Sequence, residues 1–338
     1  MSDQFDAAAA QPGPKRDRYG RYLLPDPDGG KEQPWTRATT FAKTLADTFA
    51  LTQWGERMVA KGIGLRGDLY ALACSAGVDD KETLNKVTQQ AKDAAASAAG
   101  ANLGTALHSF TEALDRGEQP VVPDPWRADV EAYRKEMSAS GLIAVPTLIE
   151  RIVVVPQYKV AGCFDRILQT TQAQINARRH LVGDLKTAKR VDYSWTEIAI
   201  QLALYAHGAA IWNALTQRYE PMPAVDQDKA IVMHLPVGQG RCHLYQVDIA
   251  AGWEAAALAA QVRAWRQRKN LAVPHGTDPL AGLKRQHTVN DLATRIGNAT
   301  TVEDLTAIWA EASAAGAWNE TLTAAARSRK HKLLATAG

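Results

Sequence analysis

The 338-residue sequence predicts an α/β protein, with a mixed sheet flanked by helices and with helical additions at both ends of the chain. Between residues 101 and 272, segments with helical spacing of apolar residues alternate with short runs rich in β-branched residues, which are typical of strands. Alanine is abundant and there are only five phenylalanines, which favours helices over an all-β architecture.

The N-terminal part divides into two predicted regions. Residues 1–34 mix proline, glycine and charged residues with little hydrophobic periodicity, and we expect a flexible tail there. Residues 35–100 are predicted to be helical, since Phe41, Leu45 and Phe49 begin one apolar face. A long helix rich in alanine and glutamine is expected to end near residue 100.

The core is predicted over residues 101–272. A helix over 103–115 is expected to end at Gly117, a plausible capping glycine. A helix over 194–215 is expected to begin with a capping box formed by Ser194 and Glu197. The other expected elements are helices over 126–140 and 250–270 and strands over 147–155, 159–169, 180–187, 229–235 and 241–249.

The C-terminal part begins with a linker rich in proline and glycine over 273–284, followed by a small helical module over 285–338. The clearest helix of this module starts at Thr301. Asp304 follows three residues later, and Leu305 and Ile308 lie at helical spacing.

Composition narrows the class of protein. A net charge of +3 is close to neutral, so any affinity for nucleic acid must come from local basic patches. The three cysteines lie far apart, which favours a reduced protein and disfavours an iron–sulfur cluster, since a cluster normally needs four thiolates. No apolar run is long enough to span a bilayer, and the N-terminus has no secretory signal. We therefore expect a cytoplasmic protein without a membrane partner.

Two aspartates and a lysine point to metal-dependent chemistry. Asp165 lies in the predicted strand 159–169, and Asp184 and Lys186 lie in the next one. Hydrolysis of a phosphodiester needs an activated water, neutralisation of charge and help for the leaving oxygen, which a divalent ion with oxygen ligands can supply. Strand alternation puts Asp184 and Lys186 on one face and Leu185 on the other. The D-x-K pattern alone is weak evidence for a metal site, because in isolation it more often forms a surface salt bridge.

Three further residues strengthen this interpretation. Gln201 and Tyr205 lie one turn apart on a predicted helix after Lys186, so their side chains project together. His108 lies on the predicted helix 103–115. A single histidine on an amphipathic helix is more often a core or boundary residue than a metal ligand.

Four segments in this order, GTALH, GCFDRIL, GDLKT and QLALY, resemble the RecB-type exonuclease branch of the PD-(D/E)XK nuclease superfamily, which includes phage-encoded recombination exonucleases. The match spans about residues 100–250. The resemblance implies a restriction-endonuclease-like core with the element order αβββαβ. It also implies cleavage of DNA that depends on Mg²⁺ or Mn²⁺, in phage or bacterial recombination or repair, in the host cytoplasm if the chain is phage-encoded.

The resemblance also implies roles for single residues. His108, Asp165 and Asp184 would bind the metal, and the Leu185 carbonyl is a further candidate ligand. Lys186 would position the attacking water, while Gln201 and Tyr205 would orient the scissile phosphate or the lysine. Because an imidazole ligand suits Mn²⁺ better than Mg²⁺, we expect manganese to support activity at least as well as magnesium.

Other residues are candidates for supporting roles. Glu150, expected at the start of the first core strand, could be a carboxylate near the metal or a solvated strand end. Lys189 and Arg190 follow the D-x-K segment and could hold the DNA backbone.

Alternatives remain open at this level. An endonuclease of the same fold and a non-catalytic DNA-binding recombination partner fit the same residues. Partners other than DNA could include a recombinase or a single-strand-annealing protein, and the chain could form a homo-oligomer.

Overall fold

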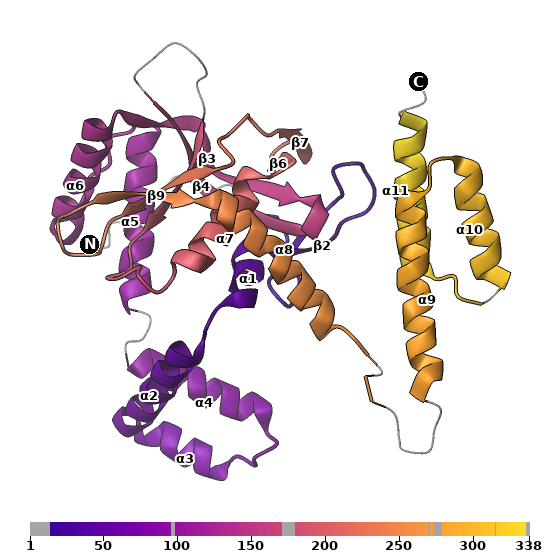
Figure 1. Cartoon of the computed structure of the whole chain (residues 1–338). Helices are drawn as coiled ribbons and strands as arrows, with labels where there is room; N and C mark the ends of the chain where they lie inside the picture. Colours follow the sequence, from indigo (N-terminus) through magenta and orange to yellow (C-terminus); the bar gives the residue numbers. More distant parts are fainter. Residues whose placement is uncertain are drawn as a thin grey trace. The chain divides into compact units, whose positions relative to one another are not determined.

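The computed structural model describes residues 14–95, 99–170, 180–269, 271–272, 279–314 and 316–335, with only the backbone described for 99–102, 279–288 and 335. The chain forms two compact units, Met1–Arg263 and Ala264–Gly338 (Figure 1). None of the described helices is long and apolar enough to cross a membrane.

One mixed sheet organises the first unit. Its order is β7-β6-β3-β4-β5-β8-β9, and β2 joins it by pairing with β4 and with β1. Most neighbours are antiparallel, whereas β5–β8 and β2–β4 are parallel. The strands are β1 (Tyr22–Leu24), β2 (Gln33–Arg37), β3 (Leu142–Val155), β4 (Val160–Thr170), β5 (Leu181–Lys186), β6 (Ala210–Asn213), β7 (Arg218–Pro221), β8 (Lys229–His234) and β9 (His243–Asp248).

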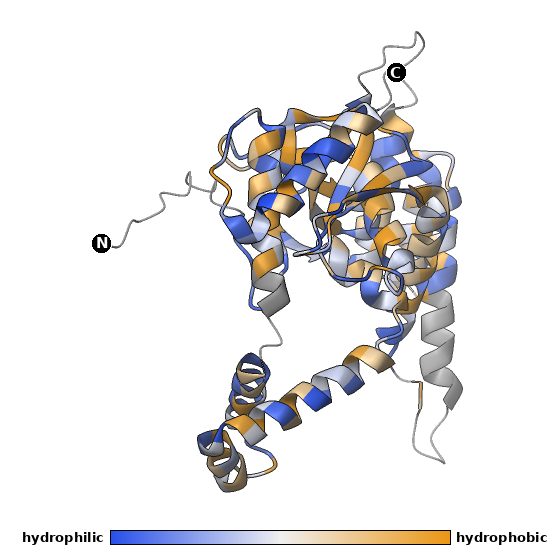
Figure 2. Ribbon diagram, turned by 90° about the vertical axis from the view of Figure 1, so that its left-hand side faces the viewer, coloured by the Kyte–Doolittle hydropathy of each residue, from blue (hydrophilic) through white to orange (hydrophobic). Residues whose placement is uncertain are grey.

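Helices cover both faces of this sheet. Residues of α1 (Ala38–Ala42), α7 (Trp195–Ala206) and α8 (Ile249–Arg266) share one buried apolar cluster with the strands. Residues of α5 (Ala99–Asp115) and α6 (Asp124–Ser140) share a second one. Hydrophobic residues follow the sheet, and hydrophilic ones mark the outer turns of the covering helices (Figure 2). The predicted α/β class with a mixed sheet flanked by helices is therefore confirmed.

Three helices between β2 and β3 in the sequence form a small cluster of their own. They are α2 (Phe49–Leu65), α3 (Gly67–Ser75) and α4 (Lys81–Ala94), and they enclose Leu69, Val87 and Ala91. Gly62 permits the close crossing of α2 and α4, since a Cβ atom there would lie 1.8 Å from the Ala91 carbonyl oxygen. Two short 3₁₀ turns, η1 (Lys43–Leu45) and η2 (Pro156–Tyr158), complete the elements of the first unit.

The second unit contains α9 (Pro279–Asn298), α10 (Val302–Ala314) and α11 (Glu320–Ala335) around its own apolar core. Asp304 and Thr301 cap α10 as the sequence suggests, because the Asp304 amide donates to Thr301 Oγ1 and the Thr301 amide donates to Asp304 Oδ2. The predicted helical module is present, but α9 already begins at Pro279, inside the expected linker. Residues 273–278 of that linker lie outside the described residues.

The predicted flexible tail is wrong for residues 14–34. These residues include β1, and Leu24 is fully buried beside Trp35. The Trp35 indole nitrogen donates to the Leu24 carbonyl oxygen at 3.0 Å. This part of the chain is anchored because Trp35 also packs on the sheet, a long-range contact that local composition does not reveal. Residues 1–13 lie outside the described part.

The expected helix over 194–215 is too long. The α7 helix ends at Ala206, and the chain then forms β6 and β7. A Cβ atom at Gly208 would lie 1.9 Å from Val153 Cγ2, so a glycine lets the chain pass close to β3 and pair with it. The capping box is also wrong, because the Ser194 side chain makes no cap hydrogen bond.

Candidate active site

Neighbouring strands bring the two aspartates together. Strands β4 and β5 run antiparallel with Arg166 opposite Gly183, which places Asp165 beside Asp184. The Leu185 amide donates to Asp165 Oδ2 at 2.7 Å and fixes that carboxylate against β5. The two aspartates therefore lie on adjacent strands, as the sequence predicts.

Asp184 and Lys186 lie on the same face of β5. The Lys186 Nζ atom is 2.6 Å from Asp184 Oδ2, while the Leu185 side chain is buried in the apolar cluster on the opposite face. Asp184 is only 1% exposed, whereas the Lys186 side chain is 26% exposed. The pair therefore reaches solvent through the lysine.

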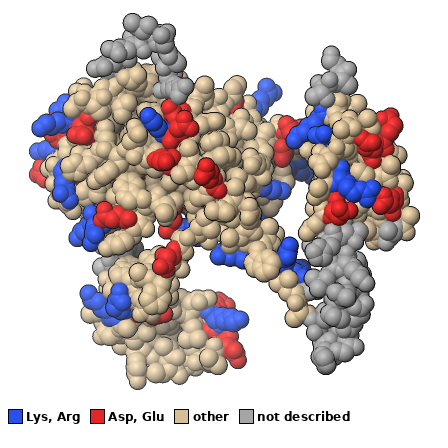
Figure 3. All heavy atoms as spheres, viewed as in Figure 1, with Lys and Arg blue, Asp and Glu red and all other residues tan. Residues whose placement is uncertain are grey.

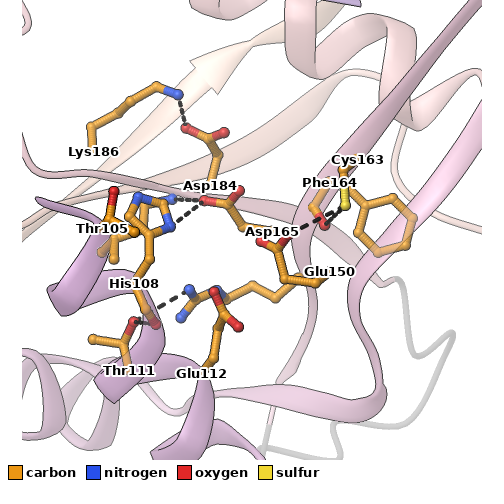
Figure 4. Close-up of polar contacts among 12 residues, drawn as sticks. Thr105, His108, Thr111, Glu112, Glu150, Cys163, Phe164, Asp165, Asp184 and Lys186 are labelled. Atoms are coloured by element: carbon orange, nitrogen blue, oxygen red, sulfur yellow. Dashed lines mark hydrogen bonds and ion pairs between the residues drawn. The ribbon is translucent and has the colours of Figure 1, made fainter. Parts of the chain in front are cut away.

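Helix α5 brings His108 to the same place. Its Nδ1 atom lies 3.7 Å from Asp165 Oδ2. The helix can approach this end of β5 because residue 104 is glycine: a Cβ atom there would lie 2.3 Å from Thr187 Oγ1. Figure 4 shows the His108 ring pointing to the Asp165 carboxylate, and the Asp184 carboxylate on the neighbouring strand turned toward Lys186.

The charges in this region do not balance within the protein. The pKa of Asp184 is raised to about 6. Burial raises it most and the charge of Asp165 adds to this effect, whereas Lys186 acts to lower it. Burial acts to lower the pKa of Lys186, but the charges of Asp184 and Asp165 raise it overall. Two carboxylates thus share one ammonium group, and an imidazole stands beside them. Carboxylate oxygens and imidazole nitrogens are atom types that divalent cations accept as ligands.

Helix α7 contributes Gln201 and Tyr205. The Gln201 Nε2 atom lies 3.4 Å from Asp184 Oδ1 and 3.2 Å from the Tyr205 hydroxyl. Tyr205 is only 2% exposed, and its ring fits against the sheet because residue 162 is glycine: a Cβ atom there would lie 2.6 Å from the ring. Gln201 therefore touches the site directly, and Tyr205 reaches it through Gln201.

The expected position of Glu150 is wrong. It does not open its strand but lies within β3, next to an irregularity in the pairing between Ala144 and Ile149. Its backbone is left-handed, with a φ angle of 52°. The sequence of β3 alone does not reveal this irregularity, because it consists of a shift in the pairing between β3 and β4.

Glu112 is a site residue that the sequence interpretation missed. Ligand atoms of His108, Glu112 and Glu150 all lie within 4.8 Å of one another (Figure 4). Although part of Glu150 is exposed, desolvation of its carboxyl and the charges of Asp165 and Glu112 raise its pKa to about 8. Glu112 follows His108 by four residues, so the helical repeat alone could have placed both on one face.

The remaining candidates lie around this centre. Lys189 and Arg190 are exposed in the segment that follows β5. Arg190 pairs with Asp192 at 3.1 Å and stacks over the Tyr193 ring. On the face shown in Figure 3, acidic and basic side chains are interspersed, in line with the net charge of +3.

Comparison with known proteins does not identify a family for the chain. No protein-family model matches it, and no curated protein matches it. The resemblance to the PD-(D/E)XK nucleases therefore remains a prediction from the four motifs, and the geometry of these motifs carries the functional argument.

Proposed function

We propose that the protein is a divalent-metal-dependent deoxyribonuclease that serves phage or bacterial DNA recombination or repair. Within this proposal, we favour an exonuclease over an endonuclease. The observation that carries this proposal is the chain of contacts on neighbouring elements: His108 lies beside Asp165, and Asp165 lies opposite the Asp184 of the buried Asp184–Lys186 pair. A lone D-x-K strand would not support it, because its lysine and aspartate could be a surface salt bridge. Here Asp184 is buried, and a second carboxylate lies beside it.

The element order supports the proposed fold. Within the first unit, α5, β3, β4, β5, α7 and β8 follow one another in the order αβββαβ, apart from α6 and the inserted pair β6–β7. The last strand of this set, β8, pairs in parallel with β5 after the crossover through α7. We propose that this set is a restriction-endonuclease-like core.

The proposed metal ligands are His108, Asp165 and Asp184, with the Leu185 carbonyl as a further candidate. Mg²⁺ or Mn²⁺ bound there would lower the pKa of a coordinated water and neutralise charge on the phosphate. Ligand atoms of Glu112 on α5 and Glu150 on β3 lie within 4.8 Å of His108, so the acidic region includes both carboxylates.

The protein side chains then have separate tasks. Lys186 stays protonated because its pKa is raised, so it can donate a hydrogen bond to the attacking oxygen and stabilise negative charge. Gln201 donates to Asp184 and holds its carboxylate in place, and Tyr205 fixes Gln201 from behind. Lys189 and Arg190 are placed to hold phosphates of the DNA backbone.

Degradation of labelled DNA tests this proposal. Linear single- and double-stranded DNA with end labels and closed circular DNA are incubated with Mg²⁺, Mn²⁺ or EDTA. We expect linear DNA to be degraded with either metal, at least as fast with Mn²⁺, and to survive in EDTA. Closed circles should stay intact, and nicking of circles would instead indicate an endonuclease.

Two variants make the result specific. Asp184→Asn should abolish degradation, whereas Asp124→Asn should not change it, because Asp124 is an exposed carboxylate on α6 paired with Arg127. Wild-type protein that binds DNA but degrades none with either metal would contradict the proposal and favour a non-catalytic DNA-binding protein.

A further inference from the structure

We propose that Arg166 is a positioning residue that locks α5 onto β4 and thereby sets the distance between His108 and Asp165. This inference rests on the proposed function, because the two residues that it aligns are the proposed metal ligands. Arg166 directly follows Asp165 in β4, so any constraint on its guanidinium also constrains the backbone that carries Asp165.

The guanidinium is completely buried and bonds only to helices in the described contacts. Arg166 is 0% exposed, and Nη1 pairs with the Asp115 carboxylate on α5. The same atom donates to the Tyr133 hydroxyl on α6 at 2.6 Å, and Tyr133 donates in turn to Asp115 Oδ2 at 2.8 Å. Arg166, Asp115 and Tyr133 thus form a closed triangle between β4, α5 and α6.

A second contact reaches the turn of α5 that carries His108. Arg166 Nη2 lies 3.5 Å from Thr111 Oγ1, and Thr111 Oγ1 donates to the His108 carbonyl oxygen at 3.0 Å. Thr111 is buried, so solvent does not replace these bonds. The guanidinium therefore holds α5 at two places, Thr111 and Asp115, which lie three and seven residues after His108 on the same helix.

Stability alone does not explain an arginine here. The position borders the apolar cluster of Leu107, Leu168 and Leu185, and a buried ion pair is often no more stabilising than apolar residues of similar size. Among the described buried side chains, Arg166 Nε is also one of the atoms without a hydrogen-bond partner. Nε is left without a partner, whereas Nη1 and Nη2 both contact α5. This arrangement indicates that Arg166 serves to align α5 rather than to improve packing.

The test separates alignment from stability. Arg166→Met and Arg166→Lys are compared with Asp129→Asn, a control in which a buried charged side chain elsewhere in the first unit loses its charge. Asp129 accepts from the Gly238 and Gly240 amides at 2.6 and 2.7 Å in the β8–β9 turn and contacts no proposed ligand. Each variant is measured for unfolding by urea, for the Kd of Mn²⁺ and for the imidazole nitrogen signals of His108 by NMR.

We expect all three variants to lose stability, but only the Arg166 variants to change the site. Arg166→Met should raise the Kd of Mn²⁺ by about tenfold or more, as is typical when support of a metal ligand is lost, and should shift the His108 signals. Arg166→Lys should recover part of the affinity. If Arg166→Met does not fold, Thr111→Val, which removes only the contact nearest His108, replaces it.

The outcomes distinguish this inference from the proposed function. Folded Arg166 variants with wild-type Mn²⁺ affinity and unchanged His108 signals would overturn the positioning role. If the wild-type protein binds no Mn²⁺ or degrades no DNA, the proposed function fails. The His108 signals still decide the role of Arg166 in that case, since they report the packing of α5 on β4 without metal.

Discussion

Two ion pairs involve the neighbouring strands β4 and β5, and they differ in their surroundings. Arg166 of β4 pairs with Asp115 of α5, and Lys186 of β5 pairs with Asp184 of the same strand. Arg166 is fully buried, and its Nη atoms bond to Asp115, Tyr133 and Thr111. Lys186 is 26% exposed and pairs with Asp184, which has a second carboxylate beside it. We call Arg166 and Asp115 the closed pair, because protein groups supply all the described partners of the Arg166 Nη atoms. We call Lys186 and Asp184 the open pair, because the Lys186 side chain is partly exposed to solvent although Asp184 is buried.

This difference indicates how the same residue types acquire different tasks. Around Arg166, the Asp115 carboxylate and the hydroxyls of Tyr133 and Thr111 supply partners for both Nη atoms, whereas Nε has no described partner. Around Lys186 the acids outnumber the bases, and the pKa values of Asp184 and Glu150 are raised to about 6 and about 8. Raised carboxylate pKa values in a polar site are typical of functional groups.

The largest expected effect concerns the open pair. Lys186→Ala should lower kcat by about 10³-fold, or about 4 kcal/mol of transition-state stabilisation, because a preorganised donor to the developing charge is lost. The Kd of Mn²⁺ should change little, since the ligands remain. Steady-state kinetics with linear DNA and titration calorimetry check both, with Lys81→Ala, an exposed lysine on α4, as the control. A Lys186→Ala protein of normal kcat would remove the distinction between the two pairs.

The closed pair should respond in stability instead. Arg166→Met leaves the Asp115 carboxylate buried without its partner and should lower the free energy of unfolding by about 3 kcal/mol. The double variant Arg166→Met/Asp115→Asn should recover part of this loss, because the uncompensated charge is gone. Urea unfolding of the wild type, the two single variants Arg166→Met and Asp115→Asn, and the double variant measures the interaction energy between Arg166 and Asp115. Losses that simply add would show that Arg166 and Asp115 do not act as a pair.

The raised pKa of Glu150 predicts a pH dependence of stability without metal. A carboxyl whose folded pKa exceeds its unfolded value stabilises the fold when protonated, and this contribution is lost as the pH rises through about 8. Metal-free wild-type protein should therefore lose stability between about pH 5 and pH 9. Because Glu150 is partly exposed, we expect Glu150→Gln to remove only about 1 kcal/mol of this loss.

Thermal unfolding over that pH range measures this effect. Added Mn²⁺ should reduce the difference between wild type and Glu150→Gln at high pH, because a bound cation offsets the acidic charge. A Glu150→Gln protein with the same pH profile as wild type would contradict the assignment of this penalty to Glu150.

The smallest expected effect lies at the exposed edge of the open pair. Lys189→Ala should weaken binding of duplex DNA modestly and lower the slope of log affinity against log salt by about 0.9, the value for one phosphate contact. Lys81→Ala on α4 serves as the control with the same loss of charge. An unchanged slope would remove Lys189 from the DNA-contacting residues.

Local patterns predicted the open pair and missed most of the closed one. Alternation in one strand suffices to place Asp184 and Lys186 together and Leu185 in the core. The burial of Arg166 depends on Asp115 and Tyr133, which lie 51 and 33 residues away. The position of Glu150 depends on an irregularity in β3 that only the pairing with β4 defines. The end of α7 depends on the contact between Gly208 and Val153. These contacts between distant segments leave no periodic signal.

The most direct test of the central claim is anomalous diffraction from crystals of the protein soaked in Mn²⁺. We expect an anomalous peak among the side chains of His108, Asp165 and Asp184, absent from crystals of the Asp184→Asn variant. Wild-type crystals without a peak there, or with manganese bound only elsewhere, would contradict it.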